Sequence, residues 1–293
     1  MRPSTRLLIL TTPPIILTYT THRYLCTLEA KYPPIDPTTT TSLALRTPSN
    51  PTTQHCPEID VYEAKHIPVK SLLKRYSTLL KSHPTTHDPH TVNKATLTNA
   101  WILTFLNTKP LIVEGSLAGL IKNKSYSPGD TGLTDPEFIP TSTPTNASSL
   151  TYKLSSIFTT PKPKTPDHTT EKSKESDRRP LLNSVFTAQH SSPTTGLLLS
   201  WYMPDEPRLF FEKIARWGYP WRLMSGGRHE LSISEVYIYQ GEEVVDVRFA
   251  SAHDYQIISD EEQKQKIVPA WVGRLHRGYA RALVDWAVRD LDA

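Results

Sequence analysis

The chain has few cysteines and few glycines for its length, two and 11 of 293 residues. Cys26 and Cys56 have neither CxxC nor Cys/His spacing, so the sequence predicts free thiols and no zinc site. The glycines form neither GxGxxG nor GxxxxGK(S/T), the loops that hold nucleotide phosphates, and no nucleophile elbow occurs. These absences argue against the enzyme classes that carry such signatures, and we expect no metal and no cofactor.

Positive charge is not concentrated where a nucleic acid would need it. The net charge is +4, but residues 196–293 carry 12 Lys or Arg against 15 Asp or Glu. The excess positive charge therefore lies in residues 1–195, much of it in proline-rich segments, and not in the part with the strongest folding pattern. We expect no nucleic-acid partner.

Hydrophobic residues make up only 37% of the chain, and 26 residues are proline, well above the usual share of about 5%. Pro, Ser and Thr crowd 36–57 and 134–195, which contain too little apolar surface to offset the entropy cost of ordering. The sequence predicts a Pro/Thr-rich linker at 26–57 and a single α+β domain at 58–293. A disordered, low-complexity insertion at about 134–195 is expected to interrupt this domain.

Residues 1–25 form an apolar segment with basic residues at its start. The uncharged run from Leu7 to Thr21 follows Arg2 and Arg6, and it is shorter than the ~20 residues that span a bilayer comfortably. Three interpretations stay open: an uncleaved signal-anchor, a mitochondrial presequence, or no targeting. The anchor is preferred because a low-complexity spacer follows, so we expect an endomembrane-associated protein, with mitochondrial localisation as the alternative.

Periodicity and turn residues predict a strand, two helices, a series of antiparallel strands and a long last helix. The expected strands are 59–67, 111–120, 150–158, 181–188, 197–203, 228–239 and 244–250, with a turn at Gly226-Gly227. The expected helices are 69–83, 91–106, 206–217 and 268–291. We expect the third to be capped by Asp205 and to pack inward through its apolar face, Phe210, Phe211, Ile214 and Trp217.

The last helix is amphipathic. Its large apolar residues recur at helical spacing and would face the sheet: Val268, Val272, Leu275, Tyr279, Leu283, Trp286 and Leu291. Arg274, Arg277 and Arg281 lie on a different face, where we expect them to be solvated and to pair with Asp285 and nearby acidic residues, or to contact anionic lipid headgroups.

This order of elements resembles the START-like helix-grip superfamily (SRPBCC), which includes plant pathogenesis-related allergens, polyketide cyclases and lipid-transfer domains. The resemblance covers roughly 58–133 and 196–293, and it implies a curved antiparallel sheet that grips the long C-terminal helix around a ligand cavity. The helix at 206–217 and the insertion depart from that pattern. A family of uncharacterised fungal proteins with an N-terminal apolar anchor is similar in PDEPRLFFEKIARWGYPWRLMSGGRHELSISE and VPAWVGRLHRGYARALVDWAV, and it implies no activity.

Aromatic and aliphatic residues of the strands and the last helix are the expected ligand contacts: Trp201, Phe249, Leu275, Tyr279, Leu283 and Trp286. His229 and His253 are weak catalytic candidates, against the plainer interpretation that they serve packing or turns. His276, in the last helix, is interpreted as a packing or rim residue. His229 shares a strand face with Leu231, whereas Glu230 points to the opposite face. Glu114 lies in an apolar run, where it either faces inward with an arginine partner or faces solvent.

The sequence predicts a membrane-tethered binding domain for a small hydrophobic, lipid-like molecule, without catalysis. A first alternative is a cyclase- or hydrolase-type enzyme on the same scaffold, which would use His229 or His253. A second is a structural or interaction protein with a filled core. A cavity large enough for a ligand is the feature that distinguishes these three hypotheses.

Overall fold

The computed structural model describes residues 3–81, 93–123, 179–182, 185–192, 196–262 and 264–292. Its strands are β1 (Gln54–His55), β2 (Ile59–Pro68), β3 (Arg179–Leu181), β4 (Phe186–Ser192), β5 (Gly196–Tyr202), β6 (Gly226–Ile233), β7 (Tyr237–Tyr239) and β8 (Glu242–Gln256). Its helices are α1 (Pro3–Lys31), α2 (Pro37–Thr40), α3 (Leu43–Arg46), α4 (Val69–Lys81), α5 (Lys94–Leu106), α6 (Lys109–Asn123), α7 (Asp205–Arg216) and α8 (Ala270–Asp292), with a 3-10 turn at Ser259–Glu261.

The strands form one open antiparallel sheet with β8 near its middle. β6 pairs with β8 on one edge, and β5, β4 and β3 continue the sheet outward. β2 and β1 pair with the other edge of β8, and β7 forms a hairpin with its start. Gln240 and Gly241 both have positive φ, as the two-residue hairpin turn requires. The antiparallel sheet and the C-terminal helix confirm the coarse α+β prediction.

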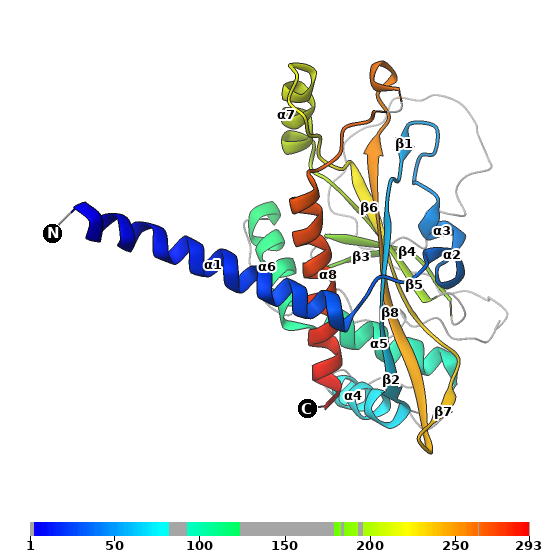
Figure 1. Ribbon diagram of the computed structural model, residues 1–293. Helices are drawn as coiled ribbons and strands as arrows, with labels where there is room; N and C mark the ends of the chain where they lie inside the picture. Colours follow the sequence, from blue (N-terminus) through cyan, green and yellow to red (C-terminus); the bar gives the residue numbers. More distant parts are fainter. Residues whose placement is uncertain are drawn as a thin grey trace, which may run out of the picture.

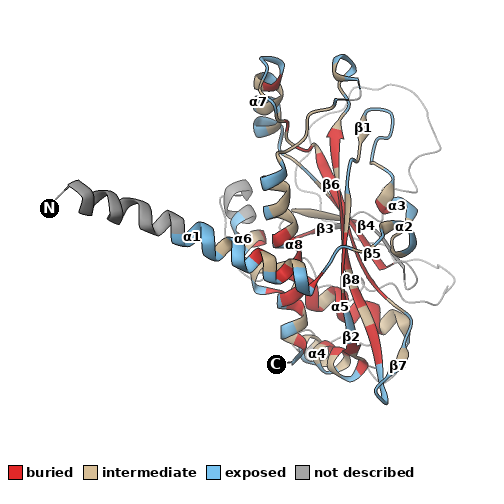
Figure 2. Ribbon diagram, viewed as in Figure 1, coloured by how far each residue is buried: buried red, intermediate tan, exposed pale blue. Residues whose placement is uncertain are grey.

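Helices cover the two faces of the sheet unequally (Figure 1). α4, α5 and α8 pack on one face, where Val245, Val247 and Phe249 of β8 enter the main core. α2 and α3 lie on the other face, where Ala250 and Ala252 belong to a smaller core. The buried residues in Figure 2 follow β6 and β8 and the sides of α5 and α8 that face them. The two cores reflect the alternation of side chains along β8.

The predicted strand at 111–120 is wrong, because α6 contains these residues. A ten-residue apolar run fits a buried helix as well as a strand. Gly115 also suits a helix contact, since a Cβ there would lie 3.1 Å from Cβ of Leu182. Gly115 is therefore a point where α6 packs closely against Leu182, and it does not interrupt a strand.

The prediction of a linker at 26–57 is also wrong. Leu28 and Tyr32 are buried in the main core, and Leu45 is buried in the smaller one. The backbone joins the fold too, because the amide of Ile35 donates to the carbonyl of Val61 at 3.1 Å. A few well-spaced apolar residues suffice to dock a segment that is otherwise rich in Pro and Thr.

The predicted insertion at 134–195 contributes two strands. β3 and β4 extend the sheet, and the expected strand at 181–188 is divided between them. The expected strand at 150–158 and most of the expected disordered run at 159–180 lie outside the described residues. Within the described residues, this part of the chain forms sheet and core, with Leu181 and Leu182 buried.

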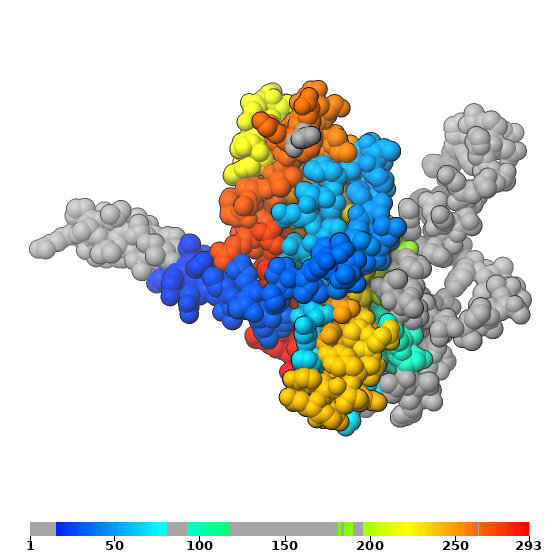
Figure 3. All heavy atoms as spheres, turned by 45° about the vertical axis from the view of Figure 1, so that its right-hand side comes forward, coloured from blue at the N-terminus to red at the C-terminus, as the bar shows by residue number. Residues whose placement is uncertain are grey.

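α1 packs against α8, so the predicted arginine face is only partly solvated, while the expected pairing with nearby acidic residues does occur. Arg281 is buried, its guanidinium donates to the carbonyl of Tyr32 at 2.9 Å, and it stacks over the ring of Tyr62. Arg274 pairs with Glu29 at 2.8 Å. Figure 3 shows α1 in blue lying across the surface beside α8 in orange-red.

Among the described residues, no helix has both the length and the apolar character needed to cross a bilayer.

The face of α8 that turns inward differs from the predicted one. Leu283 is buried, but Leu275 and Trp286 keep 43% and 39% of their surface exposed. Smaller residues take their places at the contacts: Gly278, Ala280 and Ala287. Small residues let neighbouring helices and strands approach closely, and they share the buried side of α8 with Leu283, Val284 and Leu291.

Three predictions around α7 are corrected. Phe210 and Trp217, expected to pack inward, are 59% and 75% exposed. Asp205 is the first residue of α7 and does not cap it; its carboxylate accepts from Arg208 at 2.7 Å. Gly226 and Gly227 begin β6 and do not form a turn. A Cβ on Gly226 would lie 2.5 Å from the carbonyl of Trp201, so glycine permits the close strand contact there.

Candidate functional site

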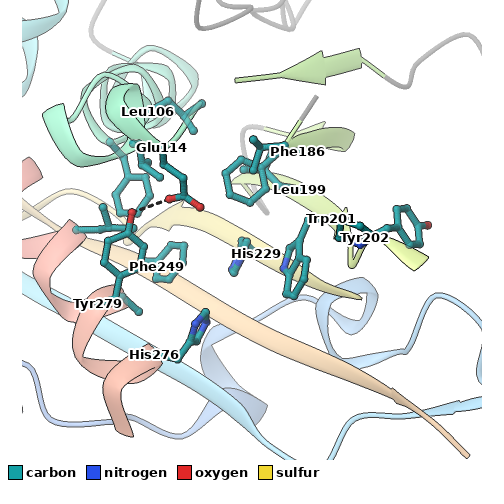
Figure 4. Close-up of a pocket in the computed structure, with 16 residues that line it drawn as sticks. Leu106, Glu114, Phe186, Leu199, Trp201, Tyr202, His229, Phe249, His276 and Tyr279 are labelled. Carbon is teal, nitrogen blue, oxygen red and sulfur yellow. Dashed lines mark hydrogen bonds between the residues drawn. The ribbon is translucent and has the colours of Figure 1, made fainter. Parts of the chain in front are cut away.

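A cavity of about 310 Å³ lies between α8, the helices α5 and α6, and the strands β4, β5, β6 and β8 (Figure 4). This volume is at the lower end of the ~300–1,000 Å³ range of small-molecule pockets. The cavity is lined mainly by aromatic and aliphatic side chains: Phe105, Leu106, Leu111, Glu114, Val185, Phe186, Leu199, Trp201, Tyr202, Pro204, His229, Phe249, His276, Tyr279, Ala280 and Leu283.

Strand alternation and helical periodicity place these side chains together. Leu199 and Trp201 are two residues apart on β5, so they share a sheet face, and Leu199 pairs directly with His229 of β6. On α8, His276, Tyr279 and Leu283 recur at spacings of three and four residues and line one helical face. Strand alternation and helical periodicity therefore direct side chains from residues between 105 and 283 toward the same cavity.

His229 lies at the centre of an aromatic wall. Its ring centroid is 5.2 Å from that of Phe249, 5.4 Å from that of Phe186 and 6.4 Å from that of Trp201. The side chain is buried, and burial, followed by the charges of His253 and His276, lowers its pKa well below the usual value. His229 is therefore a neutral imidazole near pH 7.

Two polar atoms in this wall have no partner. Among the described residues, neither Nδ1 of His229 nor Nε1 of Trp201 has a hydrogen bond, although both atoms are buried. Each such atom costs about 1–3 kcal/mol relative to a satisfied one. The Trp201 ring reaches this position because residue 227 is glycine; a Cβ there would lie 2.8 Å from Nε1.

A histidine pair borders the cavity on one side. Nε2 of His253 and Nε2 of His276 are 2.9 Å apart, and Oγ of Ser251 is 3.3 Å from the same atom of His253. Burial, then the charges of His276, Arg277 and Arg228, lowers the pKa of His253 to about 3. Burial and Arg277 also lower the pKa of His276. Both rings are therefore neutral at pH 7, and one donates its proton to the other.

A carboxylate lies at the more exposed edge of the cavity. Oη of Tyr279 donates to Oε2 of Glu114 at 2.6 Å. Burial, followed by this hydrogen bond, raises the pKa of the Tyr279 hydroxyl. The sequence left the orientation of Glu114 open: its carboxylate faces this cavity, and its partner there is a tyrosine and not an arginine.

A second cavity of about 330 Å³ lies beside the first part of α8. Glu58, Asp60, His253, Tyr255 and Arg277 line it, so its walls are more polar than those of the first cavity. His276 lines both cavities, which places the histidine pair between them.

The structure brings together four of the six expected ligand contacts. Trp201, Phe249, Tyr279 and Leu283 line the first cavity, whereas Leu275 and Trp286 do not. His229 also lines that cavity, as its strand parity predicted. His253 lies within β8, and not after it as expected, and it lines the second cavity.

Sequence reasoning missed several lining residues. Phe186 stood in the presumed insertion, and Leu111 stood in the presumed strand, so neither could be placed at the site. His276 was interpreted as a packing residue of the last helix. The sequence predicts a strand at 181–188 that includes Phe186, but no local pattern indicates that this strand pairs with β5.

The lining is short of positive charge. Among the described residues around the first cavity there is no Lys or Arg, and Glu114 supplies a carboxylate. No group of metal-binding side chains occurs in the described residues. The described lining therefore offers aromatic surface, neutral histidines, an indole and one carboxylate.

Comparisons with family models, with curated proteins and with solved structures found no match to this chain.

Proposed function

We propose that this chain is a binding module that holds one small, mainly apolar molecule between α8 and the sheet. The observation that carries the proposal is the cavity of about 310 Å³ with an aromatic wall and buried, unpartnered polar atoms at His229 and Trp201 among the described residues. An apolar molecule gains roughly 25 cal/mol for each Å² of apolar surface removed from water, and the aromatic wall offers such surface.

A helix-grip scaffold and a membrane tether are parts of the same proposal. α8 packs against β2 and β8, which supports the resemblance to helix-grip domains. Ile16, Leu17 and Tyr19 of α1 are exposed, and α1 extends away from the sheet in Figure 1, which supports a role of this helix in surface attachment. An endomembrane tether is the proposed location, and import into mitochondria is the competing hypothesis.

Binding is testable with the full chain. Native mass spectrometry should detect a co-purifying apolar molecule, and calorimetry on protein freed of it should show saturable binding of one naphthalene. Ala280→Phe should abolish this binding, because Ala280 lines the cavity and a phenyl ring would occupy part of its volume. Leu275→Ala and Trp286→Ala are matched controls on the same helix; both residues are exposed, neither lines the cavity, and both variants should bind naphthalene like the wild type.

Two results would contradict the proposal. One is a protein with no co-purifying molecule and no saturable naphthalene binding. The other is undiminished binding by folded Ala280→Phe, which would place the ligand elsewhere.

A cyclase- or hydrolase-type activity is the second candidate function. It is favoured by the contact between His253 and His276, which joins a strand and a helix at 2.9 Å and lets one imidazole orient the other. If a turnover screen finds activity, His276→Asn should reduce it at least about 100-fold, the usual contribution of general acid–base catalysis, while naphthalene binding persists. Equal activity of the variant and the wild type would eliminate this candidate.

A further inference from the structure

We infer that the ligand of the first cavity is a neutral apolar molecule with a hydroxyl group at its buried end, and that the cavity discriminates against carboxylates. This inference rests on the proposed function and names its ligand class. It depends on two independent features of the wall, namely the unpartnered polar atoms and the placement of charge.

The hydrogen-bonding groups select the polar end of the ligand. The indole N–H of Trp201 can only donate, so its partner must carry an acceptor. The neutral imidazole of His229 has one donor and one acceptor nitrogen. A hydroxyl group can accept from Trp201 and also satisfy either tautomer of His229, whereas an ammonium group has no acceptor for the indole.

The side chains that carry the two atoms are neighbours in the cavity wall. The rings of Trp201 and His229 are nearly parallel, with an interplanar angle of 14° and centroids 6.4 Å apart. Both polar atoms are buried in the wall beside the cavity, so the inference includes a rotation of the two rings that brings these atoms to the ligand. Figure 4 shows the two side chains next to each other on neighbouring strands.

The positive charges near the site are committed elsewhere. Arg228 is adjacent to His229 in sequence, but it points to the opposite face and pairs with Asp254 at 2.7 Å. Arg277 pairs with Glu58 at 3.0 Å and faces the second cavity. A carboxylate in the first cavity would be buried without a cation and near the like charge of Glu114, which is costly.

Three probes with the same ring system separate the effect of a hydroxyl group from that of a negative charge. They are 2-naphthol, naphthalene and 2-naphthoate, each titrated calorimetrically into the full chain at pH 7. We expect 2-naphthol to bind at least about threefold more tightly than naphthalene, the net effect of one or two hydrogen bonds. We expect 2-naphthoate to bind at least about tenfold more weakly than naphthalene, because its charge has no partner.

The variants assign this preference to named atoms. Trp201→Phe keeps an aromatic ring and removes Nε1, so the ratio of 2-naphthol to naphthalene affinity should fall at least about threefold. His229→Leu, an independent variant with a similar volume, should lower the same ratio. Leu283→Val is the matched control: it removes a methylene group from the cavity wall, so it should change both affinities together and leave their ratio intact.

The outcomes separate this inference from the proposed function. Failure of all three probes to bind the wild type would reject both. Binding of naphthalene as tight as that of 2-naphthol, or tighter binding of 2-naphthoate, would overturn the inference and leave the binding function standing. An unchanged ratio in both Trp201→Phe and His229→Leu would also overturn it.

Discussion

Individual histidines determine the electrostatic character of the space beneath α8. His229, His253 and His276 all have lowered pKa values, with burial as the largest cause in each case. In the folded protein these histidines stay neutral at pH values at which the same residues of the unfolded chain bind a proton. The histidines therefore add no charge to the cavities at neutral pH, and they make the fold sensitive to acid.

His253 provides the clearest pH prediction. Its pKa is about 3 in the folded protein against 6.5 for an unperturbed histidine, so between pH 6 and pH 4 only the unfolded chain takes up the proton. In this window the free energy of unfolding should fall with decreasing pH by about 1.4 kcal/mol per pH unit from this residue. Urea unfolding at pH 6, 5 and 4 should therefore show a shallower pH dependence for His253→Asn than for the wild type.

Buried carboxyl groups have the opposite effect on the pH dependence of the free energy of unfolding, but they do not alter the comparison between the wild type and His253→Asn. Burial raises the pKa values of Asp60, Glu230 and Asp254, so these groups favour the folded state as the pH falls. They are present in both proteins, and their contributions cancel in the difference. Equal slopes for the wild type and His253→Asn would show that His253 is not held neutral by the fold.

The ion pairs of Arg228 and Arg277 differ in burial and should differ in energy. Arg228 pairs with Asp254 in the interior and also donates to the carbonyl of Thr47, so Arg228→Met leaves a buried carboxylate unpaired and should cost about 3–5 kcal/mol. The carboxylate partner of Arg277, Glu58, is 62% exposed, so Arg277→Met should cost less than about 1 kcal/mol. Urea titrations at pH 7 measure both values, and similar losses would contradict the assignment.

At the scale of helices and strands, the sequence predicts what depends on local pattern. Val245, Val247 and Phe249 alternate with Asp246 and Arg248, and β8 forms with that alternation. The last helix and its length follow in the same way from periodicity. The sequence did not distinguish a helix from a strand at α6, because an apolar run that contains Gly115 fits both. The contact of Gly115 with Leu182, which lies far along the chain, is visible only in the structure.

What the sequence could not predict is which elements meet. α1 docks on α8 because Leu25 lies over Gly278, a pairing across about 250 positions that no local pattern encodes. The same contact decides which face of α8 is inward, so Leu275 and Trp286 remain exposed although their hydrophobicity predicted burial. Four of the six expected ligand contacts still line the cavity, because strand parity fixes Trp201 and Phe249 without knowledge of α1.

Gly278 tests the contact between α1 and α8. A helical Gly→Ala change ordinarily stabilises by up to about 1 kcal/mol, yet a Cβ at residue 278 would lie 2.0 Å from Cδ2 of Leu25. We expect Gly278→Ala to lower the free energy of unfolding by about 1–3 kcal/mol, measured by urea titration. Adding Leu25→Ala should recover part of the loss.

Gly273 is the matched control on the same helix. A Cβ at residue 273 would meet only the flexible end of Arg277, at 3.3 Å, so Gly273→Ala should be neutral or stabilising. If the two alanine variants have the same effect, α1 does not pack on α8 as described.

Over the whole molecule, the two faces of the sheet have different construction. One face carries α2 and α3 over a small core around Leu45, and the other carries α4, α5 and α8 over a larger core that includes the cavity. The cavity exists because α8 spans the sheet while α5 and α6 stand beside it, as Figures 1 and 4 show. The proposed binding site therefore requires several helices and strands together and is not formed by any one of them.

The most direct test is a crystal structure of the full chain soaked with 1-bromonaphthalene, with the bromine located by its anomalous scattering. We expect one strong bromine peak inside the space bounded by His229, Phe249 and Tyr279, and no such peak in Ala280→Phe. Bromine peaks confined to the surface, or a wild-type cavity closed by its own side chains, would contradict it.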